Sequence, residues 1–266
     1  MVKSVKTVVR DMLPKSFQVP VKYWYGWFRG GLEAEMKFLG ALVGPGDRVV
    51  DVGANRGVYA YRLWKLGAQV EVFEPNPICF GILSAWAAGK PGIRLHADAL
   101  SDHAGAASLH IPVDGAGVEH DASASIEHTG FPQSRDQPVQ LQTLDSYQMK
   151  DVSLIKIDVE GHEYSVLGGA VATIAASQPA LLIEIEQRHN GRPIEEVFAR
   201  IRGLGYRGFF LESGRLTVLE RFDVSRHQSM ANFGGDSGSY INNFLFLHRN
   251  RIDRSEYAGL VGTSVQ

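Results

Sequence analysis

Cysteine is almost absent from this sequence of 266 residues, because Cys79 is the only one. A single cysteine cannot form a disulfide within the chain, so a disulfide framework is excluded. Low cysteine use is typical of reducing compartments, and we expect a cytoplasmic protein. No segment approaches the roughly 20 consecutive apolar residues of a transmembrane helix. The N-terminus also lacks the apolar core and cleavage site of a secretory signal.

An excess of charge of one sign is also missing. The 27 Lys and Arg residues nearly balance the 29 Asp and Glu residues, which gives a formal net charge of −2. A protein that holds nucleic acid through its phosphates needs a basic face. The basic run RNRIDR at 249–254 is too short to form one. We therefore expect no nucleic-acid partner.

From residue 48 onward, short β-branched or Leu-rich runs alternate with helical periodicity. The strand-like runs are RVVDVG, QVEVFEP, IRLHADAL, VSLIKIDVEG and ALLIEIEQ. Runs that are apolar on both faces and joined by helices predict a parallel sheet covered on both sides. RGFFLES, RLTVLE and NNFLFLHRN are strand-like as well. No clear crossover helix precedes the last run, which favours an antiparallel edge strand.

No Ser/Gly-rich or Pro-rich linker divides the chain, so we expect one domain with appendages. We predict an N-terminal helical and aromatic cap over residues 1–32 and a single catalytic domain over residues 33–266. The strand-like runs AASLHIPV, ASASI and PVQLQTLD interrupt the α/β pattern and predict a β insertion over about 106–144. The Gly-, Ser- and Asn-rich segment 221–240 is expected to be a loop that folds over the site.

Residues 1–13, MVKSVKTVVRDML, predict a short basic amphipathic helix. The valines have helical spacing, and Lys3, Lys6 and Arg10 lie largely on another face. Such a helix either packs on the domain as a cap or makes a peripheral contact with an anionic membrane. The sequence favours the cap and leaves the membrane contact open.

Aromatic residues are concentrated shortly after this segment. Tyr23, Trp24, Tyr25, Trp27 and Phe28 fall within six residues. Aromatic side chains at this density either fill a core or line a substrate pocket. The sequence leaves both interpretations open.

A glycine-rich turn, DVGANRG at residues 51–57, joins the first predicted strand to the first predicted helix of the α/β pattern. A dinucleotide-binding turn has the spacing G-x-G-x-x-G. Here Asn55 replaces the middle glycine, and the third glycine, Gly57, comes too early. A P-loop would require a Gly-Lys-Ser/Thr sequence, which does not follow. The turn therefore favours a ligand other than a phosphate-bearing nucleotide.

Acidic residues lie at the ends of three predicted strands. Asp51, Glu74 and Asp158 would gather at the carboxyl edge of a parallel sheet. Three carboxylates repel a pyrophosphate but suit S-adenosylmethionine, which has no phosphate and carries a sulfonium and an ammonium. Glu74 follows Gly53 by 21 positions, a reach similar to that of the ribose-binding acid of nucleotide folds.

Seven blocks of the sequence carry a family resemblance. They are VVDVGANRGVYA, VFEPNP, ADALSD, TLDSY, LIKIDVEGHEYSVLGGA, LLIEIEQRH and INNFLFL. In this order they resemble the blocks of the FkbM-type methyltransferases, a class I S-adenosylmethionine-dependent family, over about residues 33–247. The resemblance implies a Rossmann-like α/β fold with a seven-stranded, mostly parallel sheet, an antiparallel last strand and helices on both faces. It also implies methyl transfer to a hydroxyl of a sugar or another natural product.

The predicted cofactor site surrounds the ends of the first three strands. The glycines of the turn would let the backbone approach the methionine part of the cofactor. Asp51 either anchors the turn or accepts from the methionine ammonium, and Asn55 either braces the loop or binds the carboxylate. Glu74 is expected to accept from the ribose, and Asp98 and Ala99 to border the adenine. The predicted cofactor-binding residues are Asp51, Gly53, Ala54, Asn55, Gly57, Glu74, Pro75, Asn76, Asp98, Ala99 and Asp158.

The run IKIDVEGHE contains a cation and several acids in close succession. In an extended strand, Lys156, Asp158 and Glu160 project to the same side. One interpretation is a buttressing ion pair of Lys156 with Asp158 or Glu184. The other places Asp158 near the sulfonium and Glu160 at the substrate mouth.

Methyl transfer to a hydroxyl also requires a group that removes the hydroxyl proton. His162 is the first candidate, because the unperturbed pKa of histidine lies near neutrality, and His189 is the second. The predicted catalytic residues are Lys156, Asp158, Glu160, His162 and His189.

Oxygen and nitrogen ligands for a metal are also available in Asp158, Glu160, Glu186 and His189. Some hydroxyl methyltransferases of this class use Mg²⁺ to acidify the nucleophile. The resemblance does not require a metal, and we expect none.

The function that these observations favour is methylation of a hydroxyl on a small molecule. Two other functions stay open. One is a binding module that keeps the cofactor fold but has lost turnover, and the other is a methyltransferase acting on RNA or protein. The sequence does not identify the acceptor, the methylated atom or the oligomeric state.

Overall fold

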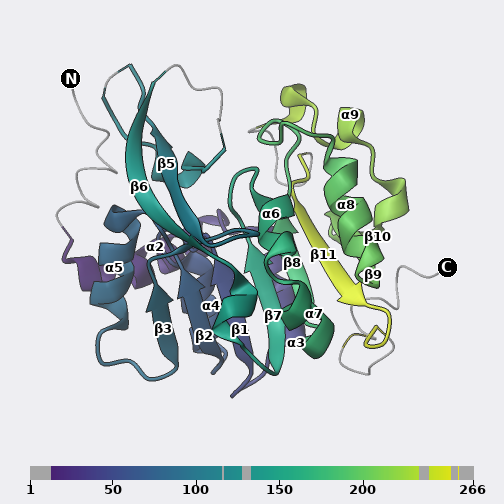
Figure 1. Cartoon of the computed structure of the whole chain (residues 1–266), viewed down its shortest axis with the longest axis horizontal. Helices are drawn as coiled ribbons and strands as arrows, with labels where there is room; N and C mark the ends of the chain where they lie inside the picture. Colours follow the sequence, from purple (N-terminus) through teal and green to yellow (C-terminus); the bar gives the residue numbers. More distant parts are fainter. Residues whose placement is uncertain (1–12, 116, 128–132, 234–239, 253–256, 258–266) are drawn as a thin grey trace.

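The computed structural model describes residues 13–115, 117–127, 133–233, 240–252 and 257. A large mixed sheet lies between two layers of helices, and a second, smaller sheet extends beyond its carboxyl edge (Figure 1). The helix expected over residues 1–13 falls almost entirely outside the described residues. Within the part of the chain that the structure describes, no helix has the length and apolar character needed to cross a membrane.

The large sheet contains eight strands in the order β10-β9-β11-β8-β7-β1-β2-β3. Their bounds are β1 Arg48–Val52, β2 Gln69–Phe73, β3 Ile93–His96, β7 Val152–Ile157, β8 Ala180–Glu184, β9 Tyr206–Glu212, β10 Arg215–Val218 and β11 Asn243–His248. β1 pairs in parallel with both β2 and β7. The predicted parallel core is therefore present, and the carboxyl ends of β1, β2 and β7 meet at one edge.

Two details of the predicted sheet were wrong. The sheet has eight strands instead of seven, because β9 and β10 form a hairpin closed by Ser213 and Gly214, with φ values of 49° and 79°. Two successive residues of positive φ are typical of the tight turn that matches strand twist. The last strand, β11, is antiparallel as expected. However, it lies between β8 and β9 instead of at the edge.

Helices cover both faces of the large sheet, as predicted. They are α2 Lys15–Arg29, α3 Leu39–Leu42, α4 Val58–Lys65, α5 Pro77–Ala87, α6 Glu163–Gly168, α7 Val171–Ser177, α8 Ile194–Gly203 and α9 Val224–His227, with short 3₁₀ segments η1 Ala34–Phe38, η2 Asp121–Ser123, η3 Leu144–Tyr147, η4 Leu219–Arg221 and η5 Met230–Asn232. Val49 packs in the core beneath α2, α4 and α5, and Val50 packs in the core beneath α6, α7 and α8. This alternation explains why the strand sequences are apolar on both faces.

The β insertion forms a sheet of its own. It has the order β4-β6-β5, with β4 at Ala99–Leu100, β5 at Gly105–Pro112 and β6 at Ser134–Gln142. The expected single strand IRLHADAL is therefore divided between the two sheets. ASASI is not a strand, because residues 121–123 form η2 and only Ser125 makes a bridge, to His110. The segment 221–240 also contains α9 and η5, so its described part is more regular than a loop.

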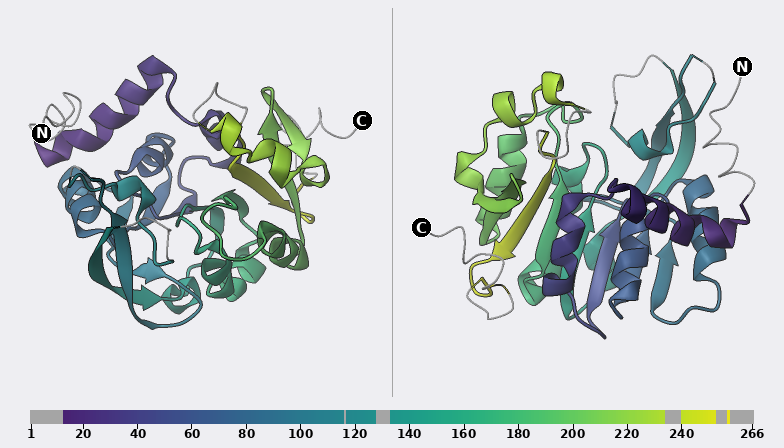
Figure 2. Two further views of the ribbon diagram at one scale, coloured as in Figure 1. Left: turned by 90° about the horizontal axis from the view of Figure 1, so that it is seen from above. Right: turned by 180° about the vertical axis from the view of Figure 1, so that it is seen from behind.

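α2 packs across α4 and α5 on one face of the molecule (Figure 2). Val19 and Tyr23 are its buried residues and belong to the main core. Tyr23 is the only member of the aromatic stretch that fills the core, since Trp24, Tyr25, Trp27 and Phe28 are exposed. The packing of α2 places Val19 next to Gly57 of the glycine-rich turn.

Candidate active site

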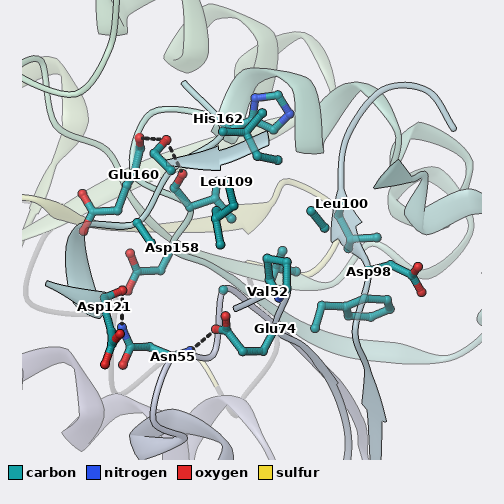
Figure 3. Close-up of a pocket in the computed structure, with 18 residues that line it drawn as sticks. Val52, Asn55, Glu74, Asp98, Leu100, Leu109, Asp121, Asp158, Glu160 and His162 are labelled. Atoms are coloured by element: carbon teal, nitrogen blue, oxygen red, sulfur yellow. Dashed lines mark hydrogen bonds between the residues drawn. The ribbon is translucent and has the colours of Figure 1, made fainter. Parts of the chain in front are cut away.

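A pocket at the carboxyl edge of the sheet collects residues from the ends of β1, β2 and β7 and from the insertion. We call it the strand-end pocket (Figure 3). Seven of the eleven predicted cofactor residues line it, namely Gly53, Asn55, Glu74, Pro75, Asp98, Ala99 and Asp158. Glu74 and Asp158 border the same space, although they come from different strands. The predicted gathering of acids at this edge is therefore present.

Glu74 is held at the bottom of this pocket by backbone amides. Its Oε2 accepts from the Asn55 amide at 2.5 Å, and its Oε1 accepts from the Asn76 amide at 2.8 Å. Burial raises the pKa of Glu74 to about 7, although the two amide hydrogen bonds act in the opposite direction. Asn76 does not line the pocket. It caps α5 by accepting from the Ile78 amide, and it thereby fixes the turn that positions Glu74.

Gly53 and Gly57, two glycines of the glycine-rich turn, allow close protein packing. A Cβ on Gly53 would lie 1.8 Å from the carbonyl oxygen of Asp158, and a Cβ on Gly57 would lie 2.6 Å from Leu83 and 3.3 Å from Val19. Both glycines also have a φ of 74°, which favours glycine. An added side chain at either position would therefore meet protein atoms, and the approach of the backbone to the cofactor stays a prediction. The turn must be glycine-rich so that β7 and α2 can pack against it.

A larger cleft of about 440 Å³ lies next to the strand-end pocket. We call it the acidic cleft, because Glu33, Asp51, Asp158, Glu160 and Glu184 line it. Three residues of α2 also line it, namely Lys22, Tyr25 and Arg29. The volume is that of a small-molecule site, which is typically about 300–1,000 Å³.

Lys156 supplies a buried cation within this cleft. Its side chain is 1% exposed, and its Nζ lies 3.5 Å from Oδ2 of Asp158 and 4.9 Å from the centre of the Tyr59 ring. Burial lowers the pKa of Lys156, but the surrounding carboxylates, Asp158 first, outweigh burial and raise it. Lys156 is therefore charged. The predicted ion pair with Asp158 is therefore present and lines the cleft, and the place of Asp158 beside a sulfonium stays a prediction.

The strand-end pocket and the acidic cleft meet at four residues. Gly53, Asn55, Asp158 and Glu160 line both spaces. Asn55 and Glu160 have φ values of 50° and 52°, a backbone conformation that is uncommon outside glycine. Such backbone conformations are found disproportionately at functional sites. A ligand in one space and a ligand in the other would therefore approach each other beside Asp158 and Glu160.

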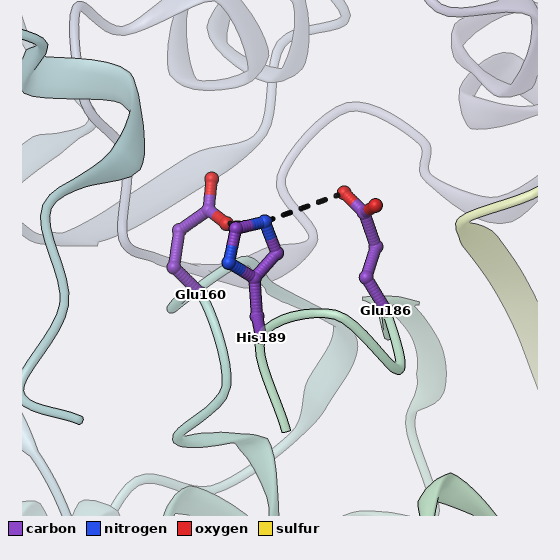
Figure 4. Close-up of side chains that lie close together, drawn as sticks. All are labelled: Glu160, Glu186 and His189. Carbon is purple, nitrogen blue, oxygen red and sulfur yellow. Dashed lines mark ion pairs between the residues drawn. The ribbon is translucent and has the colours of Figure 1, made fainter. Parts of the chain in front are cut away.

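Glu160 and His189 form a close pair at this junction (Figure 4). His189 Nε2 lies 3.0 Å from Oε2 of Glu160 and 3.9 Å from Oε1 of Glu186. Burial, together with Asp158 and Glu186, raises the pKa of Glu160 to about 8. Burial also lowers the pKa of His189. Neither ring nitrogen of His189 makes a hydrogen bond to a described residue.

His162 lines the strand-end pocket and is absent from the lining of the acidic cleft. Its Nδ1 lies 2.8 Å from Glu127, and its Nε2 lies 3.0 Å from the Ser101 hydroxyl. Both ring nitrogens are thus engaged. His189 lines neither space, although its partner Glu160 lines both. The assignment of His162 or His189 as the base stays a prediction.

Glu160, Glu186 and His189 are also close enough to be considered as metal ligands, since one ligand atom of each lies within 4.8 Å of the others. Glu186 is already paired, however. Arg188 donates to both of its carboxylate oxygens, at 2.6 and 3.0 Å, and Tyr240 donates to Oε2 at 2.6 Å. A bidentate guanidinium supplies the positive charge that a metal would otherwise bring. We therefore keep the expectation that the site uses no metal.

The comparisons with known proteins agree with this geometry. The family model described as the methyltransferase FkbM domain matches residues 51–208, which is more than half of the chain. The chain belongs to the FkbM methyltransferase family. Members of this family are S-adenosylmethionine-dependent methyltransferases. The resemblance seen in the sequence is therefore confirmed.

A solved FkbM methyltransferase from Methylobacillus flagellatus KT has a similar fold, with a TM-score of 0.51 and 15% identity over 90% of this chain. The chain spans 57% of the length of that protein. A TehB-like SAM-dependent methyltransferase from Corynebacterium glutamicum matches with a TM-score of 0.45 and 15% identity, over 86% of this chain and 96% of that one. A comparison with curated proteins finds no match.

The residues of this FkbM chain fit S-adenosylmethionine in their chemistry. Oδ2 of Asp51 is buried in the cleft wall without a hydrogen-bond partner among the described residues, as an acceptor for an ammonium would be. Glu74 would hold the ribose. Asp158 lines both spaces, so it would lie beside a sulfonium bound at their junction. The carboxylate of Asp98 instead accepts from the Tyr147 hydroxyl at 2.8 Å. Asp98 would therefore border the adenine only as part of the pocket wall.

The insertion narrows the strand-end pocket. Its free space is about 60 Å³, and Asp121, Ala124, Ser125 and Ile126 of the insertion form part of its lining. Asn55 donates to the Asp121 carbonyl at 3.1 Å, Arg56 pairs with the Asp121 carboxylate at 2.5 Å, and Ser125 donates to the Glu160 carbonyl at 2.6 Å. These contacts tie the insertion to the glycine-rich turn and to the loop after β7.

Several residues of the site were missed by the sequence reasoning. Asp121 and Ser125 come from the insertion, and Glu33 and Tyr59 line the cleft, where the Tyr59 hydroxyl donates to Glu33. Asp121 lies in a polar loop, but nothing in its local sequence indicates which face it would reach. Of the aromatic stretch, Tyr25 lines the acidic cleft, so its predicted place at a substrate pocket stays a prediction.

Proposed function

We propose that this FkbM methyltransferase transfers the methyl group of S-adenosylmethionine to a hydroxyl of a small molecule, either a sugar or another natural product. The observation that carries the proposal is the meeting of the strand-end pocket and the acidic cleft at Asp158 and Glu160. The first space suits the adenosine part of the cofactor, and the second is large enough for an acceptor. The transfer would take place between them.

The cleft suits an acceptor that donates hydrogen bonds. Glu33 and Glu184 line it with carboxyl groups, and burial raises the pKa of Glu184 well above its usual value, which favours its protonated form. An ionised carboxylate accepts from a ligand hydroxyl, and a protonated carboxyl can also donate to one. Tyr25 at the rim offers a ring face on which a sugar can stack. These features favour a polyhydroxylated acceptor over an apolar one.

Glu160 is our candidate for the general base, and His189 is its partner. S-adenosylmethionine, when bound, supplies the electrophilic methyl group. The remaining requirement is an aligned hydroxyl from which a proton is removed as the bond to carbon forms. Ionised Glu160 accepts that proton at a carboxylate oxygen. His189, whose Nε2 lies 3.0 Å from Oε2 of Glu160, would position this carboxylate, and the proton would leave Glu160 through the acidic cleft that Glu160 lines.

The test uses methyl-labelled S-adenosylmethionine and a panel of sugars, glycosides and hydroxylated natural products. We expect transfer to at least one hydroxyl compound by the parent protein. The Glu160→Gln variant should retain cofactor binding by calorimetry and lose about 10²-fold or more in turnover. Glu195→Gln, an exposed change in α8, is the matched control and should behave as the parent.

Three outcomes would contradict the proposal or its choice of base. Cofactor binding without transfer to any hydroxyl would favour the binding module. Transfer to RNA or protein in place of the small molecules would favour the other alternative. Loss of cofactor binding in Glu160→Gln would mean that this residue holds the cofactor instead of acting on the acceptor.

A further inference from the structure

A stripe of large apolar side chains runs along the outer side of α2. Phe17, Val21, Trp24 and Phe28 are spaced four, three and four residues apart, so they lie on one face of the helix. Their exposed fractions are 59%, 44%, 42% and 80%. Tyr25 and Trp27 flank the stripe and are about half exposed. Exposed apolar surface of this kind usually marks an interaction site.

This stripe is separate from the face that α2 uses in the fold. Val19 and Tyr23, the buried residues, lie on the opposite side of the helix and contact the main core. α2 is therefore apolar on two faces, and the fold of the described residues uses only one of them. The second face needs a different explanation from packing within the domain.

The charges of α2 indicate what the stripe contacts. The helix sequence KSFQVPVKYWYGWFR contains Lys15, Lys22 and Arg29 and no acidic residue. Trp and Tyr favour the boundary between headgroups and acyl chains, and each Lys or Arg near an anionic surface adds to binding. We propose that the outer face of α2 docks on an anionic lipid surface. This inference goes beyond the proposed function and does not depend on it.

A second copy of the chain is a poorer occupant of the same stripe. In a symmetric dimer the same patch lies on both partners. The three cations of one α2 would then face those of the other, and α2 has no acid to compensate them. A negatively charged lipid surface instead complements both the apolar stripe and the cations.

Docking through α2 would also orient the acidic cleft. Lys22, Tyr25 and Arg29 line the cleft as well as belonging to α2. Tyr25 also flanks the stripe, so one border of the cleft would lie beside the lipid surface. The acceptors that reach it most readily would be hydroxylated molecules held at that surface.

The experiment measures binding of the full-length protein to lipid vesicles without cofactor or acceptor, so that it is independent of methyl transfer. One set of vesicles contains phosphatidylcholine alone, and in the other part of the phosphatidylcholine is replaced by phosphatidylglycerol. We expect sedimentation with the anionic vesicles, weakened by added salt. We also expect a blue shift of tryptophan emission, because Trp24 and Trp27 are exposed in α2 whereas Trp86 is buried.

The double variant Phe17→Ser/Phe28→Ser removes two side chains of the stripe without touching the core. It should lower the vesicle partition coefficient by roughly tenfold or more, because two apolar side chains are no longer transferred from water into the lipid. Val171→Ser/Met230→Ser is the matched control. It removes two exposed apolar side chains elsewhere, with exposed fractions of 41% and 60%, and should bind as the parent.

Equal binding of Phe17→Ser/Phe28→Ser and the parent would overturn the proposal, as would the absence of binding to either type of vesicle. A variant in which Lys3, Lys6 and Arg10 are replaced by Gln tests the preceding segment. If that variant alone loses binding, the anchor lies outside α2. A concentration-dependent dimer that disappears in Phe17→Ser/Phe28→Ser, without vesicle binding, would assign the stripe to a second copy.

Discussion

His189 places its Nε2 3.0 Å from Oε2 of Glu160, although the two residues follow different strands of the sheet. A Cβ on Gly161 would lie 2.3 Å from the carbonyl oxygen of His189, so the two strand-end loops touch at this glycine. Burial and acidic neighbours raise the pKa of Glu160 to about 8, and burial lowers the pKa of His189, so near neutral pH the carboxyl carries a proton and the imidazole is neutral. The pair therefore contains a carboxyl group that ionises only slightly above neutral pH.

The pair predicts a pH dependence of methyl transfer. The pKa of Glu160 is raised to about 8 by burial and by its acidic neighbours, and a base must be ionised. Activity should therefore rise as the pH increases through about 8. In Glu160→Gln this rise should disappear from the pH profile of kcat, along with roughly 10²–10⁴-fold of the rate. His162→Gln is the comparison, and we expect it to keep the rise and to weaken cofactor binding instead.

Glu74 predicts a separable effect on cofactor binding. Glu74→Gln keeps the shape of the side chain but removes the charged acceptor for the ribose. A hydrogen bond to a charged group contributes about 1.5–3 kcal/mol, so the Kd for S-adenosylmethionine should rise by roughly 10- to 100-fold. Calorimetry measures this directly. Glu71→Gln is the control, because Glu71 lies on the same strand and contacts Arg94 and His96 away from the pocket.

The strand-end acids could be predicted because the local pattern determines where they lie. β-branched runs apolar on both faces indicate parallel strands, and parallel strands bring their carboxyl ends together. Asp51, Glu74 and Asp158 therefore meet, whichever helices cover the sheet. Lys156, Asp158 and Glu160 do line one cleft, although the expected extended strand ends at Ile157, before two of them.

The parts that could not be predicted depend on contacts between distant segments. The choice of His162 as base rested on its intrinsic pKa. After β7 ends at Ile157, however, Glu160 and Gly161 have φ values of 52° and 103°. This left-handed turn breaks the alternation of a strand and directs His162 toward Ser101. Likewise, no local pattern shows that α2 packs against Gly57.

Buried carboxylates predict that cofactor binding is linked to protons. Burial raises the pKa of Asp51 and of Glu74 to about 7 in the ligand-free protein. A bound cation favours the ionised form of a neighbouring acid and lowers its pKa. Affinity for S-adenosylmethionine should therefore increase as the pH rises from about 6 to 8, with release of protons. Calorimetry in buffers of different ionisation enthalpy measures the released protons, and an affinity that falls with pH would contradict this linkage.

Replacing Gly53 by alanine should lower the free energy of unfolding for two reasons that can be measured separately. In Gly53→Ala the new Cβ meets both a φ of 74° and the Asp158 carbonyl oxygen at 1.8 Å. Gly89→Ala provides the matched control, because Gly89 has a φ of 71° and nothing within 4 Å of the added atom. The control should lose about 1–2 kcal/mol in free energy of unfolding, which is the cost of a left-handed backbone for alanine. Gly53→Ala should lose clearly more in the same denaturant titration, and equal losses would mean that the turn and β7 can separate freely.

Chelation tests the expectation that no metal takes part. Glu186, the most buried carboxylate of the three-residue cluster, is 3% exposed and already accepts from Arg188 and Tyr240. A divalent ion at Glu160 and His189 would lie close to the Arg188 guanidinium and would be repelled by it. Methyl transfer should therefore be unchanged after EDTA treatment and dialysis, and added Mg²⁺ should not increase it.

Arg188→Gln sharpens the test, because it frees Glu186 and leaves the cluster without its cation. If the parent loses activity with EDTA and regains it with Mg²⁺, the Arg188 pairing does not exclude a metal. If only Arg188→Gln responds to Mg²⁺, the guanidinium occupies the place that a metal would take.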